Sequence, residues 1–267
     1  MNSVNNSVAV YVMTHGPECK WTGSYCFPIE IGAACHEIHS SYIRDDDGDN
    51  ISKKDILYCE LTGLYWMWKN DSAHDFLGLY HYRRIFKLSR SKIISYLRDY
   101  EWIVPKVTRV NPNISEHYIR EHIPEDWRHL METLKDLYPE YYNTAQSLFG
   151  KDEVYFTNMF ISSREMVSDY CNWLFPILQA VEVKLNLNDG RSKYQQRAIG
   201  FMAERLFYLY IKHNNFNVKE VRIWYVPPYA HLSPKIPKWV SKVVSSNIYI
   251  YNLTLMIQDF IVKYIVK

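Results

Sequence analysis

A histidine and two adjacent arginines, His81, Arg83 and Arg84, stand directly after a short apolar run. Guanidinium groups offer paired N–H donors that match phosphate oxygens, and they keep their charge at any working pH. The preceding run, residues 76–80, has the composition of a buried strand, and ligands of open α/β sheets bind just beyond the carboxyl ends of strands. The spacing therefore predicts a phosphate site, and an ordinary pair of surface arginines is the alternative.

Residues 45–50, Asp-Asp-Asp-Gly-Asp-Asn, gather carboxylates in one short segment. Oxygen ligands such as those of Asp47 and Asp49 suit Mg²⁺ or Mn²⁺ shared with a substrate phosphate. The segment is no EF-hand, because no glutamate stands at the twelfth loop position. The alternative is a solvated turn that caps the following helix through Asn50 or Ser52.

Glu204 has the chemistry of a general base. Helical spacing places Arg197, Gly200 and Glu204 on one face, with Arg205 beside the carboxylate. Such a carboxylate could take a proton from an attacking hydroxyl, with a pKa adjusted by Arg205. The glycine costs a helix about 1 kcal/mol relative to alanine and so indicates close packing, either within the fold or against a bound molecule. An internal helix ion pair is the alternative for Glu204.

A second carboxylate, Glu60, stands on a largely apolar helical face. A carboxylate beside a buried surface needs a partner. Arg83, Arg84 or a hydroxyl could supply it, so Glu60 is either part of the site or a plain structural pair.

Composition and missing motifs exclude several classes of protein. The 31 Lys and Arg residues against 29 Asp and Glu leave a net charge of +2, which argues against a coat for nucleic acid. The sequence has no GxGxxG, Walker A, GxSxG or HExxH motif, so dinucleotide dehydrogenases, P-loop NTPases and serine hydrolases are not expected. Five cysteines without a CxxC pair, no signal-peptide pattern and no apolar stretch of membrane-spanning length predict a cytosolic protein.

The elements that must position these residues follow from apolar patterning. Continuous apolar runs predict strands near residues 8–13, 27–31, 76–80, 102–104, 154–162 and 221–226. Spacings of three and four predict one helix over about 52–68, helices from 115 and from 124, and helices over 164–184 and 193–213. Strands that alternate with helices predict an α/β fold with a mainly parallel sheet. The first strand then ends at Thr14 and His15.

Five blocks together resemble a known family. They are residues 44–52, 58–70, 78–86, 158–161 and 196–206. In this order they resemble the bacterial capsule, exopolysaccharide and O-antigen glycosyltransferases long described as a domain of unknown function. Some members of that family are β-1,3-galactofuranosyltransferases. The resemblance covers roughly residues 8–226 and rests on the combination of blocks.

The resemblance implies a GT-A-like fold, a UDP-sugar donor and an inverting transfer to a growing glycan or a lipid-linked glycan. Typical GT-A enzymes end the corresponding strand in a DxD motif that holds a metal, whereas this sequence reads His81-Tyr82-Arg83-Arg84. Either the arginines neutralise the diphosphate directly, or His81 holds Mn²⁺ or Mg²⁺ with help from Asp47 and Asp49. Both alternatives stay open at the level of sequence.

Roles for individual residues follow from the same resemblance and from strand-end chemistry. Glu204 is the expected catalytic base. Cations at the β-phosphate of the leaving UDP would stabilise the transition state. The expected donor-binding residues are Thr14, His15, Asp49, Asn50, Glu60, His81, Arg83 and Arg84. The expected acceptor-binding residues are Asn158, Arg197 and Arg205.

The chain divides by composition into an expected enzyme domain, residues 1–228, and an amphipathic tail, residues 229–267. Between Lys235 and Lys267 five lysines stand against Asp259 alone, and Trp239 lies among them. Lysines beside apolar residues suit the surface of an anionic bilayer, and polar residues interrupt the segment too often for a span. We expect peripheral contact with the inner face of the cell membrane. A tail helix that packs on the core or on a second subunit is the alternative.

Two other classes of function remain as alternatives. A non-catalytic polysaccharide-binding or assembly protein would use the tyrosines and tryptophans as stacking platforms. A nucleotidyltransferase would release pyrophosphate instead of UDP. UDP binding and donor hydrolysis separate these classes from a glycosyltransferase. The donor sugar, the acceptor and the linkage depend on pocket shape, which the sequence leaves open.

Overall fold

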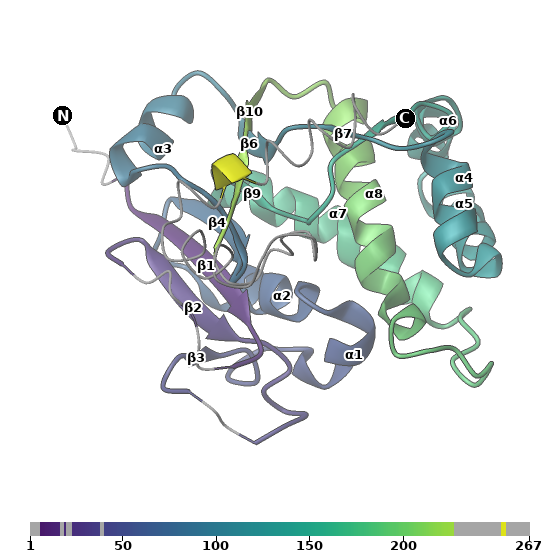
Figure 1. The fold of residues 1–267 in the computed structure, drawn as a ribbon, viewed down its shortest axis with the longest axis horizontal. Coiled ribbons are helices and arrows are strands. Elements are labelled where there is room, and N and C mark those ends of the chain that lie inside the picture. The colour runs from purple at the N-terminus through teal and green to yellow at the C-terminus, as the bar shows by residue number, and fades with distance from the viewer. Residues whose placement is uncertain (1–5, 17–18, 20–22, 38–39, 227–251, 255–267) are drawn as a thin grey trace.

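The computed structural model describes residues 6–16, 19, 23–37, 40–226 and 252–254. Its centre is a nine-stranded sheet, of which seven strands follow the order β10-β6-β9-β4-β1-β2-β3 (Figure 1). In addition, β5 pairs with β4, and β11 pairs with β5. The strands are β1 (Val8–Thr14), β2 (Cys26–Glu30), β3 (Ile43–Arg44), β4 (Phe76–His81), β5 (Arg84–Phe86), β6 (Trp102–Pro105), β9 (Phe160–Ser163), β10 (Val218–Val221) and β11 (Ile223–Tyr225). A separate ribbon joins β7 (Thr108–Arg109) to β8 (Glu153–Val154).

The central strands run mostly parallel, which confirms the predicted fold class. β1 pairs in parallel with β2 and β4, β2 with β3, and β6 with β10, while β9 lies antiparallel between β4 and β6. The helices are α1 (Asp55–Tyr58), α2 (Leu61–Asn70), α3 (Arg90–Tyr96), α4 (Ile114–Glu121), α5 (Pro124–Leu137), α6 (Pro139–Leu148), α7 (Arg164–Glu182) and α8 (Ala198–His213). Short 3₁₀ turns, η1 (Ser52–Lys54) and η2 (Gln195–Arg197), precede α1 and α8.

Strand β1 is apolar throughout because both of its faces are covered. Every residue of β1 is buried. Its odd-numbered side chains from Ala9 to Met13 join a cluster with α2, α7 and α8, and its even-numbered side chains from Val8 to Val12 join a second cluster with α3 and β5. A strand covered on both faces gives a continuous apolar run instead of an alternating one, as the sequence indicated.

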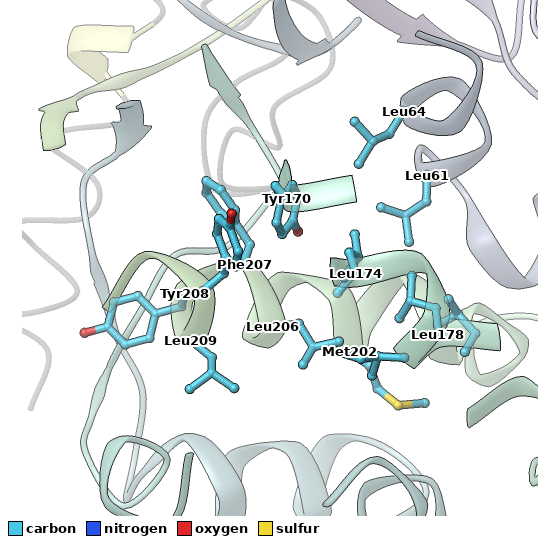
Figure 2. Close-up of a cluster of buried hydrophobic side chains, with 14 of the residues drawn as sticks. Leu61, Leu64, Tyr170, Leu174, Leu178, Met202, Leu206, Phe207, Tyr208 and Leu209 are labelled. Carbon is cyan, nitrogen blue, oxygen red and sulfur yellow. The ribbon is translucent and has the colours of Figure 1, made fainter. Parts of the chain in front are cut away.

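The larger cluster fixes α8 against the sheet. Figure 2 shows Leu61 and Leu64 of α2 near Leu174 and Leu178 of α7 and Leu206 of α8. All five are fully buried, and each contributes roughly 1.5–3 kcal/mol of hydrophobic stabilisation. The N-terminal half of α8, which carries Glu204, therefore has a fixed position relative to the strand ends.

The helix predicted from about residue 52 to residue 68 is wrong in one respect, because the chain breaks it at Cys59. There φ is 52°, a left-handed value that ends α1 and restarts the chain as α2. Neither Asn50 nor Ser52 caps this segment; Ile51 occupies the first cap position without a side-chain hydrogen bond. The break turns Glu60 to the edge of the sheet where the strands end.

The strand predicted over residues 154–162 is wrong as a single element. β8 and β9 are separated by a corner at Thr157 and Asn158, whose φ angles are 87° and 41°. The last predicted strand likewise divides into β10 and β11, and α3 and α6 were not predicted at all.

The expected division at residue 228 and the expected membrane-binding lysines from Lys235 onward lie outside the described residues. Of the expected tail, the structure describes residues 252–254. The Asn252 side chain is buried, accepts from the Tyr225 N–H at 2.9 Å and donates to the Tyr225 carbonyl at 3.0 Å. In the described part of the chain, no helix is both long enough and apolar enough to cross a bilayer.

Candidate active site

Two cavities open at the carboxyl ends of β1 and β4. The first has a volume of about 480 Å³ and is bordered by the ends of β1 and β4, helix α1, the break at Cys59 and the segment before α8. Its lining residues are Met13, His15, Ile31, Asp55, Ile56, Cys59, Glu60, His81, Tyr82, Arg83, Lys193, Gln196 and Arg197. This is the edge of the sheet at which ligands of open α/β folds bind.

The second cavity lies beside the first and has a volume of about 570 Å³. Arg83 and Arg197 line both cavities and so form their common wall. The remaining lining residues are Arg84, Lys106, Thr108, His117, Glu121, His122, Phe156, Thr157, Tyr194, Phe201, Glu204, Arg205, Ile223 and Tyr225. Two adjoining cavities with a cationic wall suit two substrates that must meet near a negatively charged group.

Glu204 is the carboxylate held most firmly in the second cavity. Its Oε1 accepts from the Thr157 N–H at 2.8 Å, and its Oε2 accepts from Arg205 Nη1 at 2.9 Å. Burial raises the pKa of Glu204 above its usual range, the charge of Arg205 opposes that shift, and the charge of Glu60 adds to it. A fixed carboxylate with a raised pKa is suited to accept a proton near neutral pH.

Arg205 supports Glu204 from within the protein. Its side chain is 2% exposed and lies between the rings of Tyr118 and Phe156, with its Cζ 5.3 and 5.0 Å from their centroids. Nη1 also donates to the Phe201 carbonyl at 2.9 Å. Arg205, expected to bind the acceptor, lines the second cavity and contacts the expected base.

The corner at Thr157 and Asn158 joins the two expected carboxylates. Asn158 Nδ2 donates to Glu60 Oε1 at 2.8 Å, while the Thr157 N–H binds Glu204. A β-branched residue with a φ of 87° is a strained conformation, and such strain persists only where surrounding contacts enforce it. The corner therefore fixes the positions of Glu60 and Glu204 relative to each other.

His81 belongs to the same network. It lies 2.8 Å from the Thr157 carbonyl, to which its Nε2–H can donate. Burial lowers the pKa of His81, and the charges of Arg84 and Arg83 add to that shift against the opposing charge of Glu60. These shifts favour the neutral imidazole, which lines the first cavity.

The structure separates the two adjacent arginines. Arg83 is exposed at the common wall, where its guanidinium lies 5.0 Å from the Tyr82 ring centroid. Arg84 is half-buried, lines the second cavity and not the first, and lies 5.9 Å from the Tyr225 ring centroid. Arg197, the second residue of the common wall, donates through Nε to Cys59 Sγ at 3.2 Å.

The expected donor residues of β1 and its turn have different placements. Thr14 is buried and bonds the carbonyl of Gly16, so it does not line either cavity. His15 lines the first cavity, and its Nε2 lies 3.1 Å from Asp55 Oδ2. Ile31, in the turn after β2, also lines the first cavity.

The acidic segment forms a structural turn apart from both cavities. Asp45 is fully buried and accepts from the N–H groups of Gly32 and Ala33. The Asp47 carbonyl accepts from Trp66 Nε1, and Asp49 contacts Asn70 through its backbone. Asn50, Asp47 and Asp49 do not line either cavity.

The metal set expected from His81, Asp47 and Asp49 does not come together in the structure. Among the described residues, no group of three or more His, Cys, Asp and Glu side chains is arranged to hold a metal ion. Within the first cavity, Asp55 pairs with His15, and Glu60 accepts from Asn158. The described residues therefore do not fit the metal of a DxD site.

Several lining residues were not found from the sequence. Lys193, Tyr194 and Gln196 come from the segment before α8. Arg191 anchors this segment through a buried ion pair to Asp126 at 3.1 Å and a second ion pair to Asp189 at 2.9 Å. The helix predicted over 193–213 included them, but α8 begins at Ala198, and no side-chain pattern marked these three as lining residues. The sequence also did not indicate which other segments would lie at the second cavity. These segments contribute Phe156, His122, Lys106 and Tyr225.

Comparisons with known proteins agree with this geometry. The sequence profile of a family described as a domain of unknown function, DUF4422, matches residues 9–215. The apo structure of the WbbM bifunctional glycosyltransferase is similar to this chain, with a TM-score of 0.77 and 29% sequence identity over 86% of this chain and 48% of that one. This chain thus spans about half the length of WbbM. No curated protein matches. The fold is GT-A-like, as the resemblance implied.

Proposed function

This chain belongs to the DUF4422 family, and we propose that it is an inverting glycosyltransferase that moves a sugar from a UDP-sugar to a growing capsule, O-antigen or exopolysaccharide glycan. Galactofuranose is the donor sugar that we propose to test first. The observation that carries the proposal is Glu204, a doubly hydrogen-bonded carboxylate in the cavity next to the strand ends of β1 and β4. The structural likeness to a bifunctional glycosyltransferase supports it.

The two cavities have separate roles in this scheme. The first takes the UDP-sugar, because it adjoins the end of β1 and contains Glu60 and His81. The second takes the acceptor, because it contains the base. The sugar is transferred from the donor in the first cavity to the acceptor in the second, next to Arg83 and Arg197, which line both cavities.

The reaction needs one proton acceptor and one site of positive charge. The acceptor hydroxyl attacks the anomeric carbon, Glu204 takes the hydroxyl proton, and the bond from that carbon to the UDP oxygen breaks on the opposite face. Negative charge then grows on the β-phosphate, and fixed cations there stabilise the transition state more than the ground state. Arg83 and Arg197 are the residues we assign to this charge, with no step that requires a metal.

The test is a panel of UDP-sugars that includes UDP-galactofuranose, assayed for UDP release with and without glycan acceptors. We expect one donor to give UDP, with activity that remains after EDTA treatment. Arg83→Ala should weaken UDP binding by roughly tenfold or more, since a charge-assisted hydrogen bond contributes about 1.5–3 kcal/mol. Arg98→Ala, outside both cavities, is the matched control.

Three results would change the proposal. Release of pyrophosphate from a nucleotide would favour a nucleotidyltransferase. Binding of polysaccharide without UDP binding or hydrolysis would favour a non-catalytic assembly protein. If EDTA abolishes the activity and Mn²⁺ restores it, a metal ion and not the arginines would be the main partner of the diphosphate.

A further inference from the structure

The second cavity carries more positive charge than its catalytic role requires. Arg84 and Lys106 line this cavity and not the first. A donor diphosphate in the first cavity can be neutralised by Arg83 and Arg197 at the common wall. Arg84 and Lys106, which do not line the first cavity, are therefore available to bind a different ligand.

Arg84 and Lys106 form no ion pair with the residues that the structure describes. The Arg84 guanidinium lies over the Tyr225 ring, 5.9 Å from its centroid. The two oxygens of Glu204 bind the Thr157 N–H and Arg205, and the charge of Arg84 also lowers the pKa of Glu204. Two carboxylates, Glu121 and Glu204, line the second cavity against five cations, which are Arg83, Arg84, Lys106, Arg197 and Arg205. This excess of positive charge attracts anions to the cavity.

An aromatic surface lies in the same cavity. The His122 ring stacks on Phe201, with centroids 4.2 Å apart and planes 24° apart, and Tyr194 lies 5.8 Å from His122 on a near-parallel plane. Burial lowers the pKa of His122 to about 4, so this stack is uncharged at neutral pH. His122 itself is buried, whereas the Tyr194 ring is 53% exposed and lies 4.9 Å from the Phe201 ring. Tyr194 therefore offers a flat face to the apolar face of a sugar, next to the cations.

We propose that the acceptor is a phosphorylated sugar: its ring stacks on Tyr194 beside Phe201, and its phosphate binds Arg84 and Lys106. This inference rests on the proposed function, since it names the acceptor class of the same site. A cavity of about 570 Å³ is large enough for a sugar with a phosphate group. The phosphate belongs either to the diphosphate of a lipid-linked glycan or to a phosphate within the glycan.

The experiment measures binding of small probes with saturating UDP present, so that the first cavity is occupied. The probes are the 1-phosphates, the 6-phosphates and the methyl glycosides of galactose, glucose and N-acetylglucosamine. We expect at least one phosphate to bind roughly tenfold or more tightly than its methyl glycoside. Arg84→Gln and Lys106→Gln should each remove most of that preference and leave UDP affinity within about twofold, and Lys135→Gln on α5 is the control.

Each outcome decides a different point. A preference for the 1-phosphate indicates the lipid-linked source, and a preference for the 6-phosphate indicates phosphate within the glycan. Equal binding of phosphates and methyl glycosides overturns the inference, as does a loss of UDP affinity in Arg84→Gln and Lys106→Gln that matches the loss for phosphates. If phosphates bind as expected but no UDP-sugar reacts, the proposed function fails while the binding preference stands.

Discussion

Both carboxylate oxygens of Glu204 accept a hydrogen bond from the protein, which fixes the direction of the group before any substrate binds. Each oxygen keeps a further lone pair, so the carboxylate can still accept a proton from a hydroxyl. The donors come from Thr157 on the corner before β9 and from Arg205 on the same helix. Fixed geometry of this kind avoids the cost of ordering the base during the reaction.

Replacing Glu204 by glutamine should abolish transfer and preserve donor binding. Glutamine keeps the shape and an oxygen for the Thr157 N–H, but it cannot take the proton. Loss of one general base lowers a rate by about 10²–10⁴. The measurement is the rate of sugar transfer together with UDP affinity, and Glu132→Gln on α5 is the matched control. Transfer within a few-fold of the wild-type rate would assign Glu204 a structural role.

The pH dependence of transfer should show the raised pKa of Glu204. Only the ionised carboxylate is a base, so activity falls as pH falls through this pKa, at a higher pH than for an ordinary glutamate. The charge of Arg205 lowers the pKa of Glu204, so Arg205→Gln should move the acid limb of the profile upward, and Arg205→Lys should move it less. The position of the limb does not depend on how much protein is folded. An unchanged limb in Arg205→Gln would contradict the assignment.

The sequence indicated the main candidates because they follow general placement rules. His81 and Arg83 follow a buried strand, and Glu204 lies on the cavity side of a helix. Asn50 looked equally suitable, yet its amide bonds the carbonyls of Asp46 and Gly48 within its own turn. Turn residues and ligand-binding residues share the same side-chain chemistry, so the sequence could not separate the two.

At the scale of elements, the sequence allowed buried strands to be predicted, but not the points at which a predicted helix or strand is broken. β1 was evident from its unbroken apolar run, which two covered faces require. The break at Cys59 depends on contacts from far along the chain, because Arg197 binds the Cys59 sulfur. The corner at Thr157 likewise depends on Glu204, 47 residues away. Apolar periodicity carries no information on such long-range contacts.

Two helical glycines should respond in opposite ways to alanine. A Cβ at Gly63 in α2 would lie 2.3 Å from Met13 Sδ and 2.9 Å from an Ile31 methyl, beside the first cavity. We expect Gly63→Ala to lower the free energy of unfolding by about 1–3 kcal/mol through overpacking. A Cβ at Gly200 would meet Cys59 only at 3.4 Å or more, an ordinary contact. Gly200→Ala should therefore be neutral or stabilising by up to about 1 kcal/mol.

Denaturant unfolding of both variants measures this difference. A strongly destabilised Gly200→Ala protein would mean that α8 packs more closely on Cys59 than the structure indicates. An unaffected Gly63→Ala protein would mean that Met13 and Ile31 move aside without cost.

At the scale of the whole molecule, the membrane expectation concerns residues outside the described ranges and stays a prediction. We expect the protein to float with anionic liposomes at low salt and to sediment without them at high salt, since each lysine near the surface adds about 1 kcal/mol. Changing Lys235, Lys238 and Lys242 together to glutamate should abolish flotation and leave UDP release unchanged. A wild-type protein that does not float at low salt would contradict the prediction.

Charge reversal tests the tail better than truncation, because residues 252–254 contact the body of the protein. Asn252 uses its amide to satisfy both the N–H and the carbonyl of Tyr225. On the other side of β11, the strand pairs with β5. A protein cut before Asn252 would lose this contact as well as the lysines.

The Asn252 side chain thus occupies the outer edge of β11 as a neighbouring strand would. An open strand edge can pair with the same edge of another copy and lead to aggregation. We expect Asn252→Ala to self-associate with increasing concentration, as measured by light scattering, and Asn252→Asp, which keeps the acceptor, to do so less. If Asn252→Ala stays monodisperse at every concentration, the edge is protected in another way. Self-association of Asn252→Ala would show instead that a single side-chain amide keeps this edge closed to other copies.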